Sequence, residues 1–173
     1  RDYFQRENLK KGLENISDND LILISDLDEV PNIDGVNLSN IDNKILIFEQ
    51  KMFFYKLNLL YENFTWHGTK GVKYKNFLGP QWLRNIKGKN YPKWRLDIFF
   101  SKKKYSNLTF INDGGWHFTC IRKPKDLQKK LLNFAHHYEF EQSGLNTIDL
   151  EKMVKEKRAI YDYQVDMRAN KWK

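Results

Sequence analysis

The sequence predicts an α/β fold in which a mixed central sheet is flanked by helices. Three observations support this prediction. The 173 residues suffice for one domain with its own core, so residues 1–173 are taken as a single domain. The 40% hydrophobic and 30% charged residues are a globular balance. Short apolar, β-rich runs fill the middle of the chain, and segments of helical periodicity lie near its two ends.

The first third of the chain is predicted to form a helix and then strands. Apolar residues at helical spacing among charged ones predict an amphipathic helix over residues 2–16. The all-apolar run Leu21–Ile24 lies between polar residues and predicts a central strand buried on both faces. Residues 45–60 are too apolar for surface and predict a strand with room for a second element.

The rest of the chain is predicted to form further strands and then helices. The expected strands and short elements are a strand or hairpin over Thr65–Tyr74 that contains Gly68 and Gly71, a short helix near Pro80–Ile86, strands over Leu96–Phe100 and Leu108–Ile111, and an aromatic strand after the glycine turn at 114–115. After Pro124 the pattern is helical through Glu141. A last helix begins at Thr147, whose hydroxyl is expected to cap it.

Composition excludes several classes of protein. The apolar content rules out a disordered tail, and no run approaches the roughly 18 apolar residues of a membrane span. The single cysteine, Cys120, excludes an internal disulfide and a Cys-rich zinc site, which fits a reducing compartment. The chain opens at Arg1 without an initiator Met, which suggests a piece of a longer protein.

The net charge of +8 indicates an anionic partner or simply good solubility. Charge alone does not choose between nucleic acid, a membrane and a phosphorylated ligand.

The segment Ser25-Asp26-Leu27-Asp28-Glu29-Val30-Pro31 places three carboxylates directly after a predicted strand. Open α/β sheets hold their ligands at such carboxyl ends. The carboxylates would repel one another unless a cation or solvent compensates them. On an extended chain Asp26 and Asp28 point to the same side, so both could face one Mg²⁺ or Mn²⁺. The alternative is a solvated acidic turn that ends at Pro31.

The run ILISDLDEVP first resembles the haloacid dehalogenase-like phosphatases, in which the leading Asp is the nucleophile and the second Asp is the acid. That family needs a later acidic pair to complete its magnesium site. The usual forms of that pair, Asp-Asp and Gly-Asp-x-x-x-Asp, do not occur here.

A second resemblance rests on three segments. Glu7, Leu9, Gly12 and Leu13 in the opening helix, then SDLDEVP, and then GGWHF about 85 residues later resemble glycosyltransferase family 17. This is the GT-A-type family of the β-1,4-mannosyl-glycoprotein N-acetylglucosaminyltransferases and their bacterial and viral relatives. The resemblance covers about Phe4 to Glu139, which is most of the chain.

The resemblance implies a divalent metal site, with Mn²⁺ or Mg²⁺ as the cofactor. Asp28 matches the metal-binding acid of the family's Asp-x-Asp, and Asp26 matches the acid near the ribose and metal. Glu29 completes the DxDE pattern. His117 in the GWH segment is the candidate last protein ligand, since neutral imidazole binds Mn²⁺ well. The alternative for His117 is a hydrogen-bonded histidine in an aromatic core.

Further residues are candidates for the donor and acceptor sides. Asp26, Arg84, Trp116 and His137 are candidates for binding the sugar nucleotide, since guanidinium groups suit phosphate and tryptophans stack on sugars. The candidate catalytic bases are Asp113, Glu29 and Glu139. Each has an ordinary alternative, such as a surface ion pair, a core aromatic side chain or an exposed helix end. Arg95, Trp66 and Trp94 are weaker candidates of the same kinds.

The function implied by the resemblance is an inverting, metal-dependent transfer of a sugar, N-acetylglucosamine or a related one, from a UDP-sugar to a hydroxyl of a glycan or glycoconjugate. No nucleic-acid partner is expected on this reading. Only about 25 residues precede Asp26, so the chain is expected to lack the N-terminal part of a GT-A-like domain that holds uridine. A cytoplasmic bacterial or viral relative is favoured over a Golgi-lumen protein.

Two other functions stay open at this stage. One is a basic module that binds nucleic acid or another polyanion, with DLDEVP as an inert turn. The other is a haloacid dehalogenase-like phosphatase.

Overall fold

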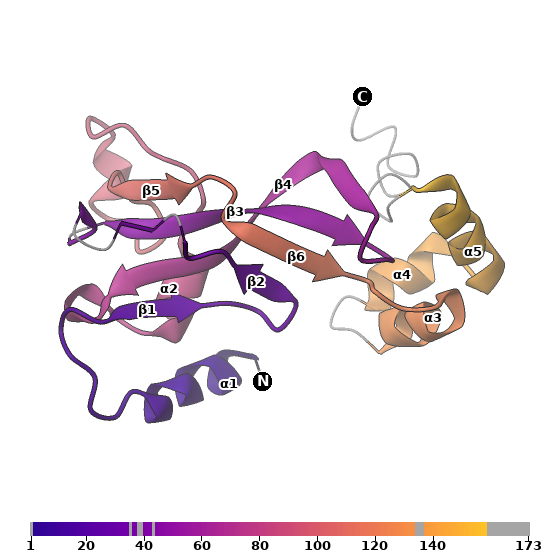
Figure 1. Cartoon of the computed structure of the whole chain (residues 1–173), viewed down its shortest axis with the longest axis horizontal. Coiled ribbons are helices and arrows are strands. Elements are labelled where there is room, and N and C mark those ends of the chain that lie inside the picture. Colours follow the sequence, from indigo (N-terminus) through magenta and orange to yellow (C-terminus); the bar gives the residue numbers. More distant parts are fainter. Residues whose placement is uncertain (1, 35, 38–39, 43, 134–136, 159–173) are drawn as a thin grey trace. The chain divides into compact units, whose positions relative to one another are not determined.

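The fold is α/β, with a mixed sheet flanked by helices (Figure 1). The computed structural model describes residues 2–34, 36–37, 40–42, 44–133 and 137–158. The chain forms two compact units. The first unit comprises residues 1–51 and 64–117, and the second comprises residues 52–63 and 118–173. In the described ranges, no helix is both long and apolar enough to cross a membrane.

Six strands form one sheet. Their bounds are β1 (Leu21–Ile24), β2 (Glu29–Pro31), β3 (Ile45–Phe54), β4 (Leu60–Lys73), β5 (Leu108–Ile111) and β6 (Gly115–Thr119). The strand order is β1-β4-β3-β6-β2, and β5 also pairs with β3. The pairs β1–β4 and β2–β6 are antiparallel and β3–β5 is parallel, so the sheet is mixed.

Each unit has its own helices, and the first unit also contains short 3₁₀ turns. The first unit holds α1 (Asp2–Asn8), η1 (Leu9–Gly12), η3 (Tyr74–Asn76), α2 (Pro80–Asn85) and η4 (Leu96–Ile98). The second unit holds α3 (Pro124–Leu132), α4 (His137–Ser143) and α5 (Thr147–Glu156).

The first unit buries both faces of its strands. Ile45 and Ile47 of β3 pack in one cluster with Leu83 of α2, whereas Leu46 and Phe48 pack in another. Successive strand residues point to opposite faces, which explains why ILIF is apolar without interruption. This packing fixes the sheet whose ends carry the acidic cluster.

The second unit has its own core. Its described members are Met52, Phe54, Tyr55, Cys120, Leu127, Phe140, Leu150 and Met153. Helices α3, α4 and α5 each contribute to it, so within that unit the C-terminal helices pack with the end of β3 and with Cys120, which follows β6.

The strand predicted at Leu21–Ile24 is confirmed, but its central position is wrong. β1 lies at one end of the strand order. Ile22 and Ile24 are buried in one cluster, and Leu21 and Leu23 are half-buried against the other. The sequence of an edge strand can therefore be as apolar as that of a central strand when both of its faces are covered.

The N-terminal helix is shorter than predicted. α1 ends at Asn8, and the chain tightens into the 3₁₀ turn η1, which ends at Gly12. Glycine is among the poorest helix formers, which fits an end at this point.

The apolar residues 45–60 form β3 and the start of β4. The amide of Phe54 donates to the carbonyl of Leu59 at 3.0 Å, and Tyr55 takes a φ of 64° in the connecting turn. β4 then continues through Gly68 and Gly71 as one strand. A Cβ at Gly71 would lie 2.7 Å from Leu23 of the paired strand, so this glycine permits close packing and does not mark a turn.

The strand predicted over Leu96–Phe100 is wrong, because this segment contains the 3₁₀ turn η4. The amide of Phe99 donates to the carbonyl of Leu96, and Ser101 donates to Ile98. The Arg95 guanidinium binds Asp97 through two hydrogen bonds of 2.8 Å, which favours the tight turn over an extended strand.

The helical region after Pro124 contains α3 and α4, and residues 134–136 between them lie outside the described residues. α5 begins at Thr147 as predicted, but the capping residue is wrong. The Asn146 side chain accepts from the amides of Ile148 and Asp149, and Asp149 accepts from the amide of Asn146. The hydroxyl of Thr147 instead meets Gln128 of α3.

Candidate functional site

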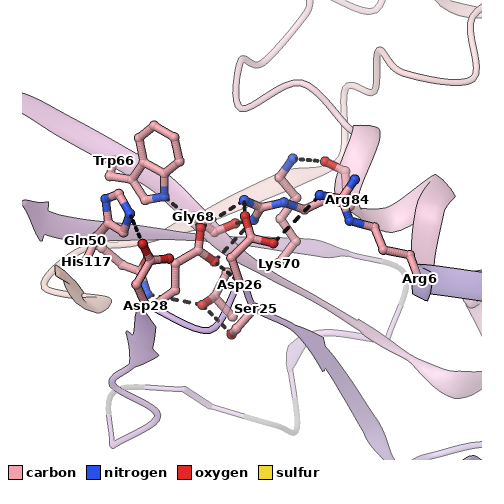
Figure 2. A network of polar contacts seen from close by, with 12 residues as sticks. Arg6, Ser25, Asp26, Asp28, Gln50, Trp66, Gly68, Lys70, Arg84 and His117 are labelled. Atoms are coloured by element: carbon pink, nitrogen blue, oxygen red, sulfur yellow. Dashed lines mark hydrogen bonds and ion pairs between the residues drawn. The ribbon is translucent and has the colours of Figure 1, made fainter. Parts of the chain in front are cut away.

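The acidic cluster forms a tight turn at the carboxyl end of β1, as predicted. The amide of Glu29 donates to the carbonyl of Asp26 at 3.0 Å, and the amide of Asp26 donates to Glu29 Oε2 at 3.0 Å. The chain is therefore not extended here, and Asp26 and Asp28 contact different partners (Figure 2). The extended conformation on which the predicted same-side arrangement rests is wrong, because the chain turns at Leu27 and Asp28.

Glu29 is the centre of the network, and its side chain is fully buried. Its Oε1 accepts from the indole nitrogen of Trp66 at 2.7 Å and from Arg84 Nη2 at 2.9 Å. Its Oε2 accepts from Arg84 Nη1 at 3.2 Å and from the amide of Asp26. A buried carboxylate is tolerated only with such partners, so Glu29 holds β2, β4 and α2 together.

Arg84 comes from α2 and links the acidic turn to β4. Besides Glu29, it contacts Asp26 Oδ2 and donates to the carbonyl of Gly68 at 2.8 Å. Arg6 of α1 lies 3.8 Å from the other oxygen of Asp26. The predicted phosphate-binding arginine therefore already binds two of the three carboxylates.

Asp28 faces His117 of β6. The distance between Asp28 Oδ2 and His117 Nε2 is 3.5 Å (Figure 2). The His117 side chain is nearly fully buried, and its ring stacks on Trp66 with centroids 4.6 Å apart and planes at 17°. The structure therefore brings together two of the three predicted metal ligands.

The β2–β6 pair brings His117 to the acidic turn. Glu29 lies opposite His117 in the register, and Pro31 lies opposite Gly115. Gly115 has a φ of 118°, and a Cβ there would lie 2.0 Å from the carbonyl oxygen of Val30. Only glycine allows this approach, which gives the Gly-Gly part of the GGWHF segment a physical reason.

Two buried polar atoms of this network have no hydrogen-bond partner among the described residues, Gln50 Oε1 and His117 Nδ1. The Gln50 amide nitrogen donates to Thr69 Oγ1 at 3.1 Å, and this hydroxyl also contacts Ser25 Oγ at 2.7 Å. Such buried unpaired atoms are rare in structural cores and are more common where a ligand binds.

Lys70 is buried beside the arginine. Its Nζ donates to the carbonyl of Arg84 in the last turn of α2 and to the carbonyl of Ile86, the residue that follows this helix. Burial, with repulsion from Arg84 as the next cause, lowers the pKa of Lys70 to about 8. Lys70 thereby ties the helix that carries Arg84 to β4.

Asp113 lies apart from this network in the turn before β6. It is exposed, takes a φ of 48° and pairs with Lys51 at 2.7 Å. Its carbonyl accepts from the Asn32 side chain, which places it at the Pro31 end of the β2–β6 pair, whereas His117 lies at the Glu29 end. Lys51 lowers the pKa of Asp113, which makes it a weaker base.

Two other candidates of the first unit, Trp116 and Arg95, have different surroundings. Trp116 lies next to His117 on β6 and is half-exposed opposite Val30. Arg95 binds Asp97 in the η4 segment. His137 begins α4 in the second unit, and the Glu139 side chain lies outside the described residues.

Sequence reasoning missed the roles of Gln50, Trp66 and Lys70 in this network. The sequence offers Trp66 as a sugar-stacking or a core residue, and the structure shows its indole nitrogen donating to Glu29 and its ring stacked on His117. Gln50 lies between Phe48 and Met52 on the buried side of the apolar segment 45–54, and a polar residue at such a position is a signal of a buried partner. Lys70 lies in the polar segment TWHGTKGVK and carries no such signal.

The described part of the chain contains no group of three or more His, Cys, Asp or Glu side chains that could hold a metal ion. Asp28 and His117 form a pair. Neighbouring ligands of an octahedral cation with bonds of about 2.1 Å stand about 3 Å apart, so the 3.5 Å pair is close to that spacing. A carboxylate and an imidazole also suit Mn²⁺. The spacing of these two side chains is therefore compatible with their binding one divalent cation together.

Comparison of the chain with models of protein families, with curated proteins and with solved structures found no match in any of the three.

Proposed function

We propose that this chain is part of a GT-A-like, metal-dependent inverting glycosyltransferase that uses a UDP-sugar, with N-acetylglucosamine or a related sugar as the group transferred. The observation that carries the proposal is the Asp28–His117 pair beside the ion-paired turn of Asp26, Glu29 and Arg84. Two of the three segments that carry the resemblance to glycosyltransferase family 17, SDLDEVP and GGWHF, supply all of these residues except Arg84.

The proposal gives Asp28 and His117 one task, to hold Mn²⁺ or Mg²⁺. A bound cation would neutralise charge on the diphosphate leaving group. Trp66 holds the imidazole plane by stacking, and the turn hydrogen bonds hold Asp28 at its tip. In the tautomer that carries its proton on Nδ1, the neutral imidazole would have its Nε2 lone pair available to a cation that Asp28 also binds.

Glu29 and Arg84 act on this proposal as positioning residues. Glu29 already accepts four hydrogen bonds in a buried place, which leaves it poorly suited to take a proton from an acceptor hydroxyl. Of the three predicted bases, Asp113 and Glu139 stay predictions. Asp113→Asn tests the first of these, since loss of sugar transfer with Mn²⁺ binding intact would support Asp113 as the base.

The geometry favours the transferase over a phosphatase. A nucleophilic Asp26 would need a carboxylate open to a phosphate group, yet Asp26 is ion-paired with Arg84 and lies near Arg6. The proposed partners are therefore a UDP-sugar and a glycan or glycoconjugate acceptor.

Calorimetric titration tests the proposal. MnCl₂ and then UDP are titrated into the full chain, with and without EDTA, and into Asp28→Ala and His117→Ala. We expect UDP binding that requires the metal and weakens at least tenfold in both variants. Release of UDP from UDP-N-acetylglucosamine is measured in parallel.

Asp34→Ala is the matched control, because Asp34 is an exposed acid of the same unit outside the network. It removes the same charge and should leave binding unchanged. UDP binding that ignores EDTA and survives Asp28→Ala would contradict the proposal and favour a basic polyanion-binding module. Absence of any Mn²⁺ binding would contradict it as well.

A further inference from the structure

The segment 93–104 of the first unit, here called the aromatic loop, exposes four large apolar side chains within seven residues. These are Trp94 at 79%, Leu96 at 75%, Phe99 at 76% and Phe100 at 90% exposure. Large apolar side chains gathered on a surface mark interaction sites, whereas single ones are ordinary. The loop contributes nothing to the acidic turn, so the proposed transfer reaction does not explain it.

A cluster of charged side chains around Tyr91 holds the aromatic loop in this shape. Arg95 and Lys104 both bind Asp97, and both cations also lie about 5.5 Å from the ring centroid of the buried Tyr91. The pKa of Asp97 falls to about 2 because of its hydrogen bonds to Arg95 and Lys104, so the Asp97 carboxylate keeps its charge at any physiological pH.

The ends of the loop are also fixed by backbone hydrogen bonds. The amide of Lys87 donates to the carbonyl of Lys103, and the amide of Tyr91 donates to the carbonyl of Tyr105. Within η4, side chains three residues apart eclipse one another, which places Leu96 and Phe99 on one side of the turn. The apolar side chains are therefore presented by an ordered scaffold.

The charges around the exposed side chains are positive. Lys93, Lys102 and Lys103 are exposed, and the one acid of the loop, Asp97, is neutralised by its own two cations. Aromatic and aliphatic side chains beside lysines are the composition of protein segments that lie in the interface of an anionic bilayer.

We propose that the aromatic loop docks the chain on the surface of a membrane that contains anionic lipid. The four apolar side chains enter the boundary between headgroups and acyl chains, and the exposed lysines contact the anionic headgroups. The loop lies on the membrane and does not span it.

The composition favours lipid over single-stranded nucleic acid. Nucleic-acid surfaces use aromatic rings for stacking, but Leu96 has no such role. Leu96 and Phe99, on one side of the 3₁₀ turn, together suit an acyl-chain boundary.

Vesicle flotation tests the proposal with the full chain. The vesicles are phosphatidylcholine alone and phosphatidylcholine with about 30% phosphatidylglycerol. We expect flotation with the anionic vesicles only, weakened by high salt, and a blue shift of tryptophan emission that Trp94→Ala reduces.

Two variants separate the apolar and charged contributions. Phe99→Ser with Phe100→Ser should weaken flotation at least tenfold, and Lys102→Glu with Lys103→Glu should do the same. Both pairs are exposed, so the fold should persist, as circular dichroism would verify. Leu57→Ser is the control, because Leu57 is an exposed leucine of the second unit.

The proposal is overturned if the chain does not float with anionic vesicles, or if Leu57→Ser weakens flotation as much as the loop variants. A third result would also overturn it. In that result the Phe99→Ser, Phe100→Ser variant floats normally, the Lys102→Glu, Lys103→Glu variant does not, and a single-stranded oligonucleotide competes with the vesicles for the chain. The loop would then bind polyanions in general.

Discussion

Glu29 is the residue on which the candidate site depends. Removing its carboxylate leaves the Arg84 guanidinium and the Trp66 indole without their shared acceptor. Breaking a buried ion pair from one side costs about 3–5 kcal/mol. We expect Glu29→Ala to lower the free energy of unfolding by that amount in urea titrations.

The conservative change Glu29→Gln keeps an acceptor for Trp66 and should cost clearly less. Glu14→Ala, at an exposed position of the same unit, should change stability by no more than about 0.5 kcal/mol. Equal stability of Glu29→Ala and Glu14→Ala would show that the network does not hold the fold.

Lys70 makes stability depend on pH in alkaline solution. Its pKa falls from the usual 10.5 to about 8 in the folded protein, chiefly because of burial. Between these two values the unfolded chain binds more protons than the folded one, so this group raises stability as the pH rises from about 8 toward 10.5.

Lys70→Met removes that contribution. Urea unfolding of both proteins at several pH values across this window should show stability of the original chain rising relative to the variant. A constant difference between the two would mean that Lys70 titrates normally.

At the scale of elements, the glycine before Trp116 controls the β2–β6 pair. Gly115→Ala would place an alanine at a φ of 118°, with its Cβ 2.0 Å from the carbonyl oxygen of Val30. We expect a loss of roughly 2–4 kcal/mol in stability, because the strands must separate or the backbone must shift. Calorimetry should also show Mn²⁺ affinity falling at least tenfold, because β6 carries His117 to Asp28.

Gly12→Ala is the matched control, since a Cβ at Gly12 meets nothing within 4 Å. It should leave both stability and Mn²⁺ affinity nearly unchanged. If Gly115→Ala changed stability and Mn²⁺ affinity as little as Gly12→Ala, the inference that β2 and β6 approach too closely for a side chain at residue 115 would be wrong.

The start of α5 offers a test of local capping. Asn146 accepts two amide hydrogen bonds and Asp149 completes the capping box. Asn146→Ala should cost about 1 kcal/mol in thermal or urea unfolding, whereas Asn90→Ala at an exposed position should be neutral. If Thr147→Val lowered the free energy of unfolding more than Asn146→Ala, the Thr147 hydroxyl would be the cap, as the sequence predicts.

These elements show what local pattern can predict. Leu21–Ile24 and Leu108–Ile111 are predicted correctly because apolar runs act over a few residues. The start of α5 at Thr147 is also predicted correctly, although Asn146 and not the Thr147 hydroxyl caps it. Leu96–Phe100 was misread because an apolar run looks alike in a strand and in an exposed 3₁₀ turn, and the Asp97 contacts that decide between them come from Arg95 and Lys104.

At the scale of the whole molecule, the candidate site depends on contacts between distant parts of the sequence. Asp28 and Glu29 could be picked out because they are adjacent in an acidic cluster. Their partners Trp66, Arg84 and His117 lie 37 to 89 positions away, and strand pairing together with the packing of α2 on the sheet brings them together. Composition and spacing name such residues but do not pair them.

The described residues of this network all belong to the first unit, which predicts that the two cores affect the site differently. Leu83→Ala opens the first-unit core under α2, and Leu127→Ala opens the second-unit core. Each should cost about 2–5 kcal/mol, since both leucines are fully buried. Calorimetry on folded protein should then show weaker Mn²⁺ binding for Leu83→Ala alone, because α2 carries the guanidinium that holds the acidic turn. Equal weakening by Leu127→Ala would mean that the second unit also shapes the site.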